Sequence, residues 1–165
     1  KWTGPNDEKT VLFEHIEMKI LMVCLGNICR SPMAEGVMRE LLEGSAHEVD
    51  SAGTSSFHAG ERPDDRMLRT AKKYGVSMNG IRSRGFKVED FDRFDRIYVM
   101  DRSNLQNVLL LARREQDRAK VELLLNASHP GEDREVPDPY YGGEKGFDQV
   151  YLMILEACQK IKDGL

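Results

Sequence analysis

Five residues separate Cys24 from Arg30 in a stretch that reads Cys-Leu-Gly-Asn-Ile-Cys-Arg-Ser-Pro. A cysteine thiolate is a strong nucleophile, and the planar guanidinium of an arginine can bind two oxygens of a phosphate. Backbone N–H groups of the loop, together with those of a helix that starts after it, can point at the same anion. The stretch therefore predicts a site that holds a tetrahedral oxyanion against a thiolate.

Other residues of this loop have types that suit the same chemistry. Gly26 permits a backbone conformation that most residues resist. Asn27 tolerates left-handed backbone and can hold the loop by side-chain hydrogen bonds. Ser31 is placed to donate a hydrogen bond to Cys24, which would stabilise the thiolate as nucleophile and as leaving group. Cys29 is either a small loop residue or a second thiol that traps oxidised Cys24 as a disulfide, and the sequence leaves both roles open.

Thiolate attack on a phosphate ester also needs an acid that protonates the leaving group. Asp138 lies between two prolines, which stiffen its loop, and is followed by Tyr140 and Tyr141. By itself an aspartate between prolines is more often a turn, but together with the Cys24 loop it predicts the general acid. The two tyrosines would flank a flat substrate ring.

The elements that must position these residues alternate between strand and helix. The apolar run Lys19–Val23 predicts a strand buried on both faces, and apolar residues recur at helical spacing from Met33 to Leu42. Further elements are predicted at the following places: strands at His47–Ala52, Arg96–Met100 and Val121–Leu125, helices from Pro63, after the capping residues Asp101 and Ser103, and from Phe147 to Lys162, and a helical turn at Val88–Phe91. This order predicts a single α/β domain, a four-stranded parallel sheet with helices on both faces. Ligands of such sheets bind beyond the carboxyl ends of the strands, where Cys24 would lie.

Composition excludes several other classes of protein. The chain has 165 residues with 24 basic and 28 acidic side chains, a net charge of −4, which argues against a general nucleic-acid binder. No apolar run approaches the ~20 residues that cross a bilayer, so no membrane partner is expected. The three cysteines, Cys24, Cys29 and Cys158, provide neither a disulfide framework nor four zinc ligands, and Cys158 is expected in the core. Such low cysteine usage fits a cytoplasmic location, although secretion without a signal peptide stays open.

Two further stretches carry weaker expectations. Met18 reads as a natural start, so residues 1–17 are expected to be a tag or an N-terminal extension and residues 18–165 the domain, the alternative being a genuine N-terminal arm. Arg82 and Arg84, in the basic stretch Gly80–Gly85, are expected to be solvated.

The stretch from Val23 to Glu35 resembles the phosphate loop of the low-molecular-weight protein tyrosine phosphatases. Asp-Pro-Tyr-Tyr-Gly, which begins at Asp138, is similar to the acid loop of that family. Residues 50–55 and 100–105 also look like family segments, so the similarity runs from Met18 to the C-terminus. The resemblance implies a flavodoxin-like fold of the phosphotyrosine phosphatase I type, in agreement with the predicted parallel sheet.

The resemblance also implies roles for individual residues. Cys24 would be the nucleophile, Arg30 the phosphate clamp and Asp138 the general acid. Three residues would form a network that supports the loop, namely Asn27, Ser31 and Ser51, and four would line the substrate cleft, namely Leu25, Phe57, Tyr140 and Tyr141. Relatives often carry a histidine near the start of the stretch 80–84, and its absence here leaves that stretch without an implied role.

The activity implied is hydrolysis of phosphotyrosine through a phosphocysteine intermediate, with no metal or other cofactor. The partners would be phosphotyrosine-containing proteins, with inorganic phosphate as product and inhibitor, and the chain is expected to be a monomer that binds no nucleic acid.

Three alternatives stay open. Arsenate reductases share the loop but need further resolving cysteines, and after Tyr74 only Cys158 remains. Phosphoarginine phosphatases resemble the chain more closely but tend to have threonine at the position of Ile28, and the apolar Ile28 favours an aryl phosphate. A phosphotyrosine-binding module without turnover would have no need of Asp138.

Overall fold

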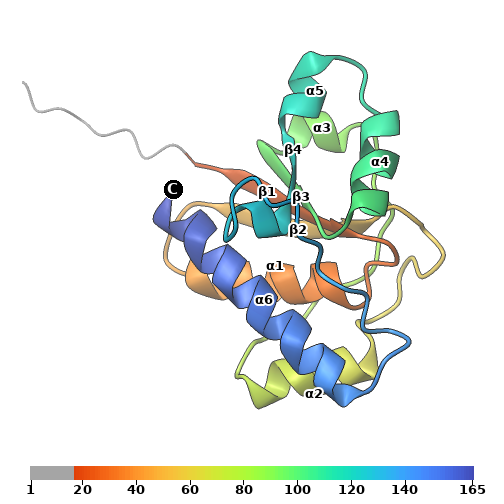
Figure 1. Cartoon of the computed structure of the whole chain (residues 1–165), viewed down its shortest axis with the longest axis vertical. Helices are drawn as coiled ribbons and strands as arrows, with labels where there is room; N and C mark the ends of the chain where they lie inside the picture. The colour runs from red at the N-terminus through yellow and green to blue at the C-terminus, as the bar shows by residue number, and fades with distance from the viewer. Residues whose placement is uncertain (1–16) are drawn as a thin grey trace, which may run out of the picture.

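The computed structural model describes residues 17–165, so the expectation of a tag or extension lies, apart from Glu17, outside the described residues. At its centre is a sheet of four strands, β1 (Lys19–Cys24), β2 (Glu48–Gly53), β3 (Arg96–Val99) and β4 (Val121–Leu123) (Figure 1). The strands are all parallel and lie in the order β2-β1-β3-β4. The predicted sheet is confirmed.

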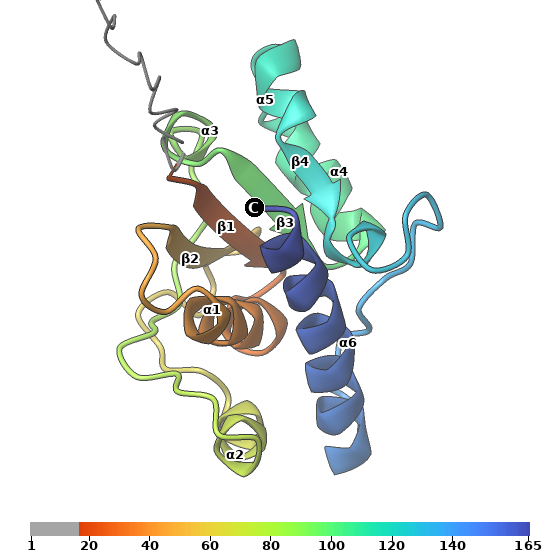
Figure 2. The same cartoon turned by 90° about the vertical axis from the view of Figure 1, so that its left-hand side faces the viewer.

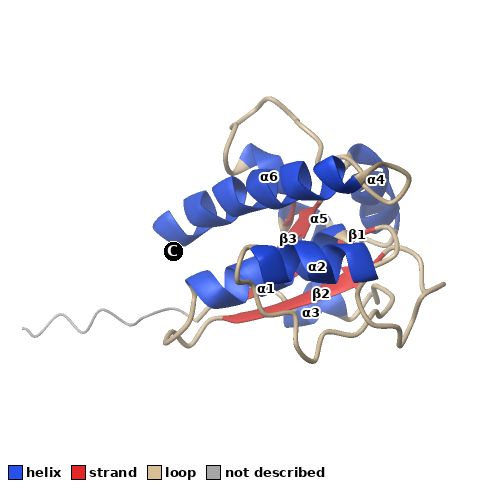
Figure 3. Cartoon of the chain, turned by 90° about the horizontal axis from the view of Figure 1, so that it is seen from below, coloured by secondary structure: helices blue, strands red, loops and turns tan. Residues whose placement is uncertain are grey.

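Helices cover both faces of this sheet, as predicted. On one side lie α1 (Arg30–Leu41), α2 (Asp65–Lys73) and α6 (Glu144–Asp163), with α6 packed across α1 and α2 (Figures 2 and 3). On the other side lie α3 (Asp90–Arg93) and α4 (Arg102–Leu110), and α5 (Glu115–Ala119) leads into β4. Among residues 17–165, no helix is long and apolar enough to cross a membrane.

The alternation of side chains along β1 divides the core into two clusters. Ile20, Met22 and Cys24 belong to the cluster that α1, α2 and α6 cover. Leu21 and Val23 belong to the second cluster, beneath α3 and α4. Successive side chains of a strand point to opposite faces of the sheet, so a continuous apolar strand needs helices on both sides.

Several boundaries differ from the sequence prediction. The second helix begins at Asp65 instead of Pro63, because the carboxylate of Asp64 accepts the N–H of Arg66 and caps the helix. Asp101 caps α4 as expected, but its partner in a capping box is Asn104, whereas Ser103 lies exposed inside the helix. Three other boundaries differ by two or three residues from those predicted. The helical turn lies at Asp90–Arg93, β4 ends at Leu123 and is followed by the 3-10 turn Leu124–Asn126, and α6 begins at Glu144.

Helix α5 was missed altogether. Its five residues, Glu-Gln-Asp-Arg-Ala, contain no apolar periodicity. Asp117 within it accepts hydrogen bonds from the backbone and side chain of Arg113, so local polar contacts hold this turn.

Chain topology places the functional residues at one edge of the sheet. The chain leaves β1 through α1 to reach β2 and then crosses to the other side of β1 to form β3. Strand order therefore reverses around β1, and the carboxyl ends of β1 and β3 border the crevice in which α/β proteins of this kind bind ligands.

Candidate active site

The loop between β1 and α1 carries the predicted nucleophile and its clamp. Cys24 is the last residue of β1, and Arg30 is the first residue of α1. The N-cap residue, Cys29, forms no side-chain capping bond, so the first N–H groups of a 12-residue helix have no such partner. This helix start can bind an anion, as the sequence predicted.

The backbone of this loop corrects one expectation. Asn27, with φ of 54°, has the left-handed conformation, whereas Gly26 does not have a positive φ. What position 26 requires is space, because a Cβ there would lie 3.1 Å from Cδ2 of His58.

Hydrogen bonds around Cys24 direct a hydroxyl group at its sulfur. Its Sγ lies 3.0 Å from Oγ of Ser31. Nδ2 of Asn27 donates to that same Oγ at 2.7 Å, and an amide nitrogen can only donate. The hydroxyl proton of Ser31 is therefore left for Sγ of Cys24, since the other acceptor in reach, the carbonyl of Ala52, is 3.4 Å away.

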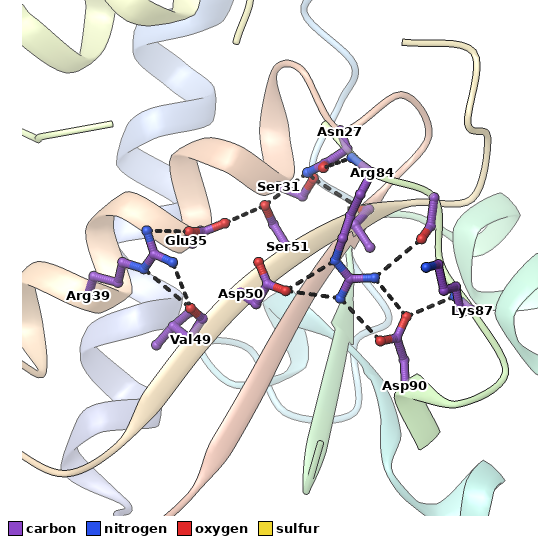
Figure 4. A network of polar contacts seen from close by, with 12 residues as sticks. Asn27, Ser31, Glu35, Arg39, Val49, Asp50, Ser51, Arg84, Lys87 and Asp90 are labelled. Atoms are coloured by element: carbon purple, nitrogen blue, oxygen red, sulfur yellow. Dashed lines mark hydrogen bonds and ion pairs between the residues drawn. The ribbon is translucent and has the colours of Figure 1, made fainter. Parts of the chain in front are cut away.

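A polar network behind the loop holds Asn27 in place (Figure 4). Its Nδ2 also donates to Oγ of Ser51 at 2.9 Å, and Ser51 in turn donates to Oε1 of Glu35 at 2.6 Å. Burial raises the pKa of Glu35, and the bond from Ser51 and the ion pair with Arg39 oppose that shift. The three support residues that the resemblance implied are thus brought together, and Glu35 completes their network.

The stretch 80–85, for which no role was expected, supports the loop from the other side. Ser83 donates its hydroxyl to the carbonyl of Gly26 at 3.0 Å, and the backbone N–H of Arg84 donates to Oδ1 of Asn27 at 3.0 Å. The side chain of Arg84 was expected to be solvated, and this prediction is wrong. It forms ion pairs with Asp50 and the fully buried Asp90 (Figure 4). These carboxylates fix the backbone whose N–H orients Asn27.

Arg30 is held by groups far away in the sequence. Its Nη1 donates to Oδ2 of Asp101 at 2.7 Å and to the carbonyl of Val136 at 2.9 Å. Its Nη2 lies 3.7 Å from Oδ2 of Asp138. The guanidinium therefore links the end of β3, the segment before α6 and the phosphate loop.

These elements enclose a cleft of about 340 Å³. Ten of its lining residues are candidates from the sequence, namely Cys24, Leu25, Gly26, Ile28, Cys29, Arg30, Phe57, Asp138, Tyr140 and Tyr141. The three other candidates, Asn27, Ser31 and Ser51, are buried and support the loop. Ser55 and His58 also line the cleft and were not predicted, although their place just after β2 was a signal that would have found them.

Asp138 reaches the cleft from the loop that precedes α6. One carboxylate oxygen, Oδ1, accepts the backbone N–H of Tyr140 at 3.0 Å, and the other faces Arg30. The rings of Tyr140 and Tyr141 meet edge to face with centroids 5.0 Å apart, and Tyr141 is almost fully exposed. The predicted nucleophile, clamp and acid thus share one cavity with aromatic side chains at its rim.

The three cysteines are all free. Burial, followed by the charges of Asp64 and Cys24, raises the pKa of Cys29 far above its usual range. Burial alone raises the pKa of Cys158, which lies in the core as expected. Within the described part of the chain, no three His, Cys, Asp or Glu side chains gather as a metal site.

Comparison with known sequences places these features in one family. The family model for low molecular weight phosphotyrosine protein phosphatases matches residues 19–165. A Synechocystis protein assigned to the low molecular weight protein-tyrosine-phosphatases is 45% identical over 152 residues, which cover 90% of this chain and 96% of that protein. A low molecular weight phosphotyrosine protein phosphatase of Schizosaccharomyces pombe is 42% identical over 147 residues, covering 86% of this chain and 93% of the yeast protein.

Solved structures show the same architecture. The crystal structure of a protein tyrosine phosphatase from Entamoeba histolytica superposes with a TM-score of 0.81 at 41% identity, covering 88% of this chain and 94% of the other. The crystal structure of an arginine phosphatase from Drosophila also superposes with a TM-score of 0.81, at 36% identity, covering 89% and 97% of the two chains.

Proposed function

The chain belongs to the low molecular weight phosphotyrosine protein phosphatase family, and we propose that Cys24, Arg30 and Asp138 carry out its hydrolysis of phosphotyrosine. The observation that carries this assignment of roles is the single cleft in which all three side chains meet. Cys24 lies at its base beside Ser31, and Arg30 and Asp138 face each other across 3.7 Å.

In the first step, the thiolate of Cys24 attacks phosphorus in line with the ester oxygen. A sulfur–phosphorus bond forms, the bond from phosphorus to the phenolic oxygen breaks, and Asp138 gives its proton to that oxygen. Arg30 and the N–H groups at the start of α1 hold the three equatorial oxygens, over which charge is spread in the transition state.

In the second step, water attacks the phosphocysteine and Asp138 accepts a proton from it. Cys24 leaves as a thiolate, which the hydroxyl of Ser31, 3.0 Å away, stabilises again. The balance is one phosphate ester and one water consumed, and one phenol and one inorganic phosphate released. The product binds the same groups as the substrate and therefore inhibits.

Aromatic and apolar side chains around the cleft support an aryl ester as substrate. Phe57 and Tyr141 are exposed at the rim, and Ile28 also lines the cleft. Apolar and aromatic side chains at these positions, with isoleucine and not threonine at position 28, suit a phenol ring better than the charged guanidinium of phosphoarginine. We propose that the substrates are phosphotyrosine-containing proteins and that the chain acts as a cytoplasmic monomer without a metal or other cofactor.

Hydrolysis assays test this proposal. The protein is assayed separately with p-nitrophenyl phosphate, with phosphoarginine, and with arsenate plus a thiol reductant. A chelator is present in all three assays. We expect turnover of the aryl ester, loss of it in Cys24→Ser, and slowing by roughly 10²-fold or more in Asp138→Ala when the leaving group is a poor one. Preferred turnover of phosphoarginine or arsenate, or full activity of Cys24→Ser, would overturn the proposal.

Substrates are then identified with a trapping variant. Asp138→Ala keeps Cys24 and Arg30, so it should bind phosphotyrosine proteins and release them slowly. The matched control is the same variant with vanadate or excess phosphate in the loop, which should prevent the capture.

A further inference from the structure

Arg66, in the first turn of α2, contacts the loop that carries the general acid. Its Nη1 donates to the carbonyl oxygen of Tyr140 at 2.8 Å, across 74 residues of sequence. Its guanidinium also lies over two rings, with Cζ 5.1 Å from the ring centroid of Tyr140 and 4.9 Å from that of Phe147 on α6. The side chain therefore holds the backbone and the ring of Tyr140 against the first turns of α2 and α6.

Tyr140, in turn, holds the acid. The backbone N–H of this residue donates to Oδ1 of Asp138 at 3.0 Å. Tyr140 thus uses its N–H to fix the carboxyl of Asp138 and its C=O to accept the bond from Arg66. A displacement of Tyr140 would displace the carboxyl that must reach the leaving-group oxygen.

The guanidinium of Arg66 is itself fixed from the side of the phosphate loop. Asp64 accepts from Nε of Arg66 at 3.1 Å and from Nη2 at 3.1 Å. The backbone N–H of Asp64 donates to the carbonyl of Ile28 at 2.8 Å. A continuous path of hydrogen bonds therefore runs from the phosphate loop through Asp64, Arg66 and Tyr140 to Asp138.

We propose that Arg66 is a positioning residue of the reaction, which sets the place of the general acid relative to the phosphate loop through Tyr140. It does not contact the phosphate, and it is absent from the lining of the cleft. Nη2 of Arg30 and Oδ2 of Asp138 are 3.7 Å apart, too far for a hydrogen bond, so Tyr140 is the nearer anchor of the acid. The inference rests on the proposed role of Asp138.

A positioning role predicts a loss that depends on the leaving group. Phenolate is a poor leaving group that needs the acid, whereas p-nitrophenolate departs with little help. In Arg66→Ala we expect kcat/KM for phenyl phosphate to fall roughly tenfold to a hundredfold, the range for a misplaced catalytic group. For p-nitrophenyl phosphate we expect a loss of about threefold or less, because the acid contributes little there. The inhibition constant of inorganic phosphate should stay unchanged.

A double-mutant cycle separates positioning from other effects. If Arg66 acts through the acid, Arg66→Ala should change phenyl phosphate turnover by less than about twofold in the Asp138→Ala background, because interacting residues are not additive. Arg66→Lys keeps the positive charge but cannot hold Asp64 by two bonds and reach Tyr140 as well, so it should behave like Arg66→Ala. Its thermal melting curve serves as the check on folding.

Arg69→Ala is the matched control, one turn further along α2. Within residues 17–165, the side chain of Arg69 forms no hydrogen bond or ion pair, and it lies beside Arg66 in a surface hollow outside the cleft. This variant should keep wild-type kinetics with both esters.

The outcomes can be told apart. Equal losses with both esters, full additivity with Asp138→Ala, or rescue by lysine would overturn the positioning role of Arg66. If Asp138→Ala alone hydrolysed phenyl phosphate at the wild-type rate, the proposed general acid would be wrong as well.

Discussion

Arg30 and Asp101 form an ion pair of 2.7 Å between the phosphate loop and the segment that follows β3. Oδ2 of Asp101 accepts a hydrogen bond from Nη1 of Arg30, while Oδ1 accepts one from the backbone N–H of Asn104 and caps α4. One carboxylate thus orients the phosphate clamp and starts a helix. The arginine is almost fully buried, so its direction is set before any phosphate arrives.

Replacing Asp101 by asparagine should weaken phosphate binding while leaving the fold intact. Asparagine caps helices as well as aspartate does, so the melting temperature should change little. Loss of the charge frees Arg30 to turn toward Asp138, and we expect kcat/KM for p-nitrophenyl phosphate to fall roughly tenfold. Steady-state kinetics with phosphate inhibition measure this, and an unchanged inhibition constant would contradict it.

Glu35 should make the protein less stable as pH rises. Burial raises its pKa above the ordinary 4.5, so the folded state holds this proton more tightly than the unfolded chain does. Its contribution to the free energy of unfolding is therefore greatest below the unfolded pKa and declines as pH rises toward the folded value. In Glu35→Gln this decline is absent, so the difference in stability between variant and wild type should grow from pH 4.5 to neutrality.

Urea unfolding at a series of pH values measures that difference. Glu40→Gln, on the exposed side of the same helix, is the control and should follow the wild type. A constant difference between Glu35→Gln and the wild type across this range would show that Glu35 does not titrate as described.

Cys24 should be the thiol that reacts first. It lines the cleft beside Arg30, whereas burial raises the pKa values of Cys29 and Cys158 and keeps both protonated near neutral pH. Brief treatment with iodoacetate, followed by peptide mass spectrometry, should place the label on Cys24. Inorganic phosphate should slow this labelling, and earlier labelling of Cys29 would contradict the assignment.

Phe57 should contribute to substrate binding and not to stability. Its side chain is 86% exposed at the rim of the cleft. An aromatic contact contributes about 0.5–1.5 kcal/mol, so Phe57→Ala should raise KM for aryl phosphates roughly two- to tenfold at constant melting temperature. Leu110→Ala, which removes an equally exposed side chain at the end of α4, is the control. An unchanged KM in Phe57→Ala would remove this residue from the binding surface.

Much of the fold followed from local patterns. The first strand was recognised because it is a short run with apolar side chains for two faces, and the large helices because their apolar residues recur with helical spacing. Helix α5 and the exact start of α2 were not recognised, because polar capping and side-chain contacts decide them.

Within the site, residues that come from one loop were predictable and their remote partners were not. Asp101 was seen as a helix cap but not as the partner of Arg30, although it lies just beyond the carboxyl end of β3, next to β1. Arg84 was expected in solvent because its two carboxylate partners, Asp50 and Asp90, belong to different elements. His58 was not predicted, although it follows Phe57 shortly after the carboxyl end of β2, the edge of the sheet at which ligands bind.

The sequence by itself determined the centre of the site, because Cys24 and Arg30 lie within one loop and covalent connection brings the proposed nucleophile and its proposed clamp to the same helix start. Only the tertiary structure decided how that centre is completed. Asp101 and Val136 accept hydrogen bonds from Arg30 across 71 and 106 residues of sequence, and Tyr140 accepts one from Arg66 across 74 residues. Such distances depend on how the helices pack on the two faces of the sheet, and no local pattern encodes them.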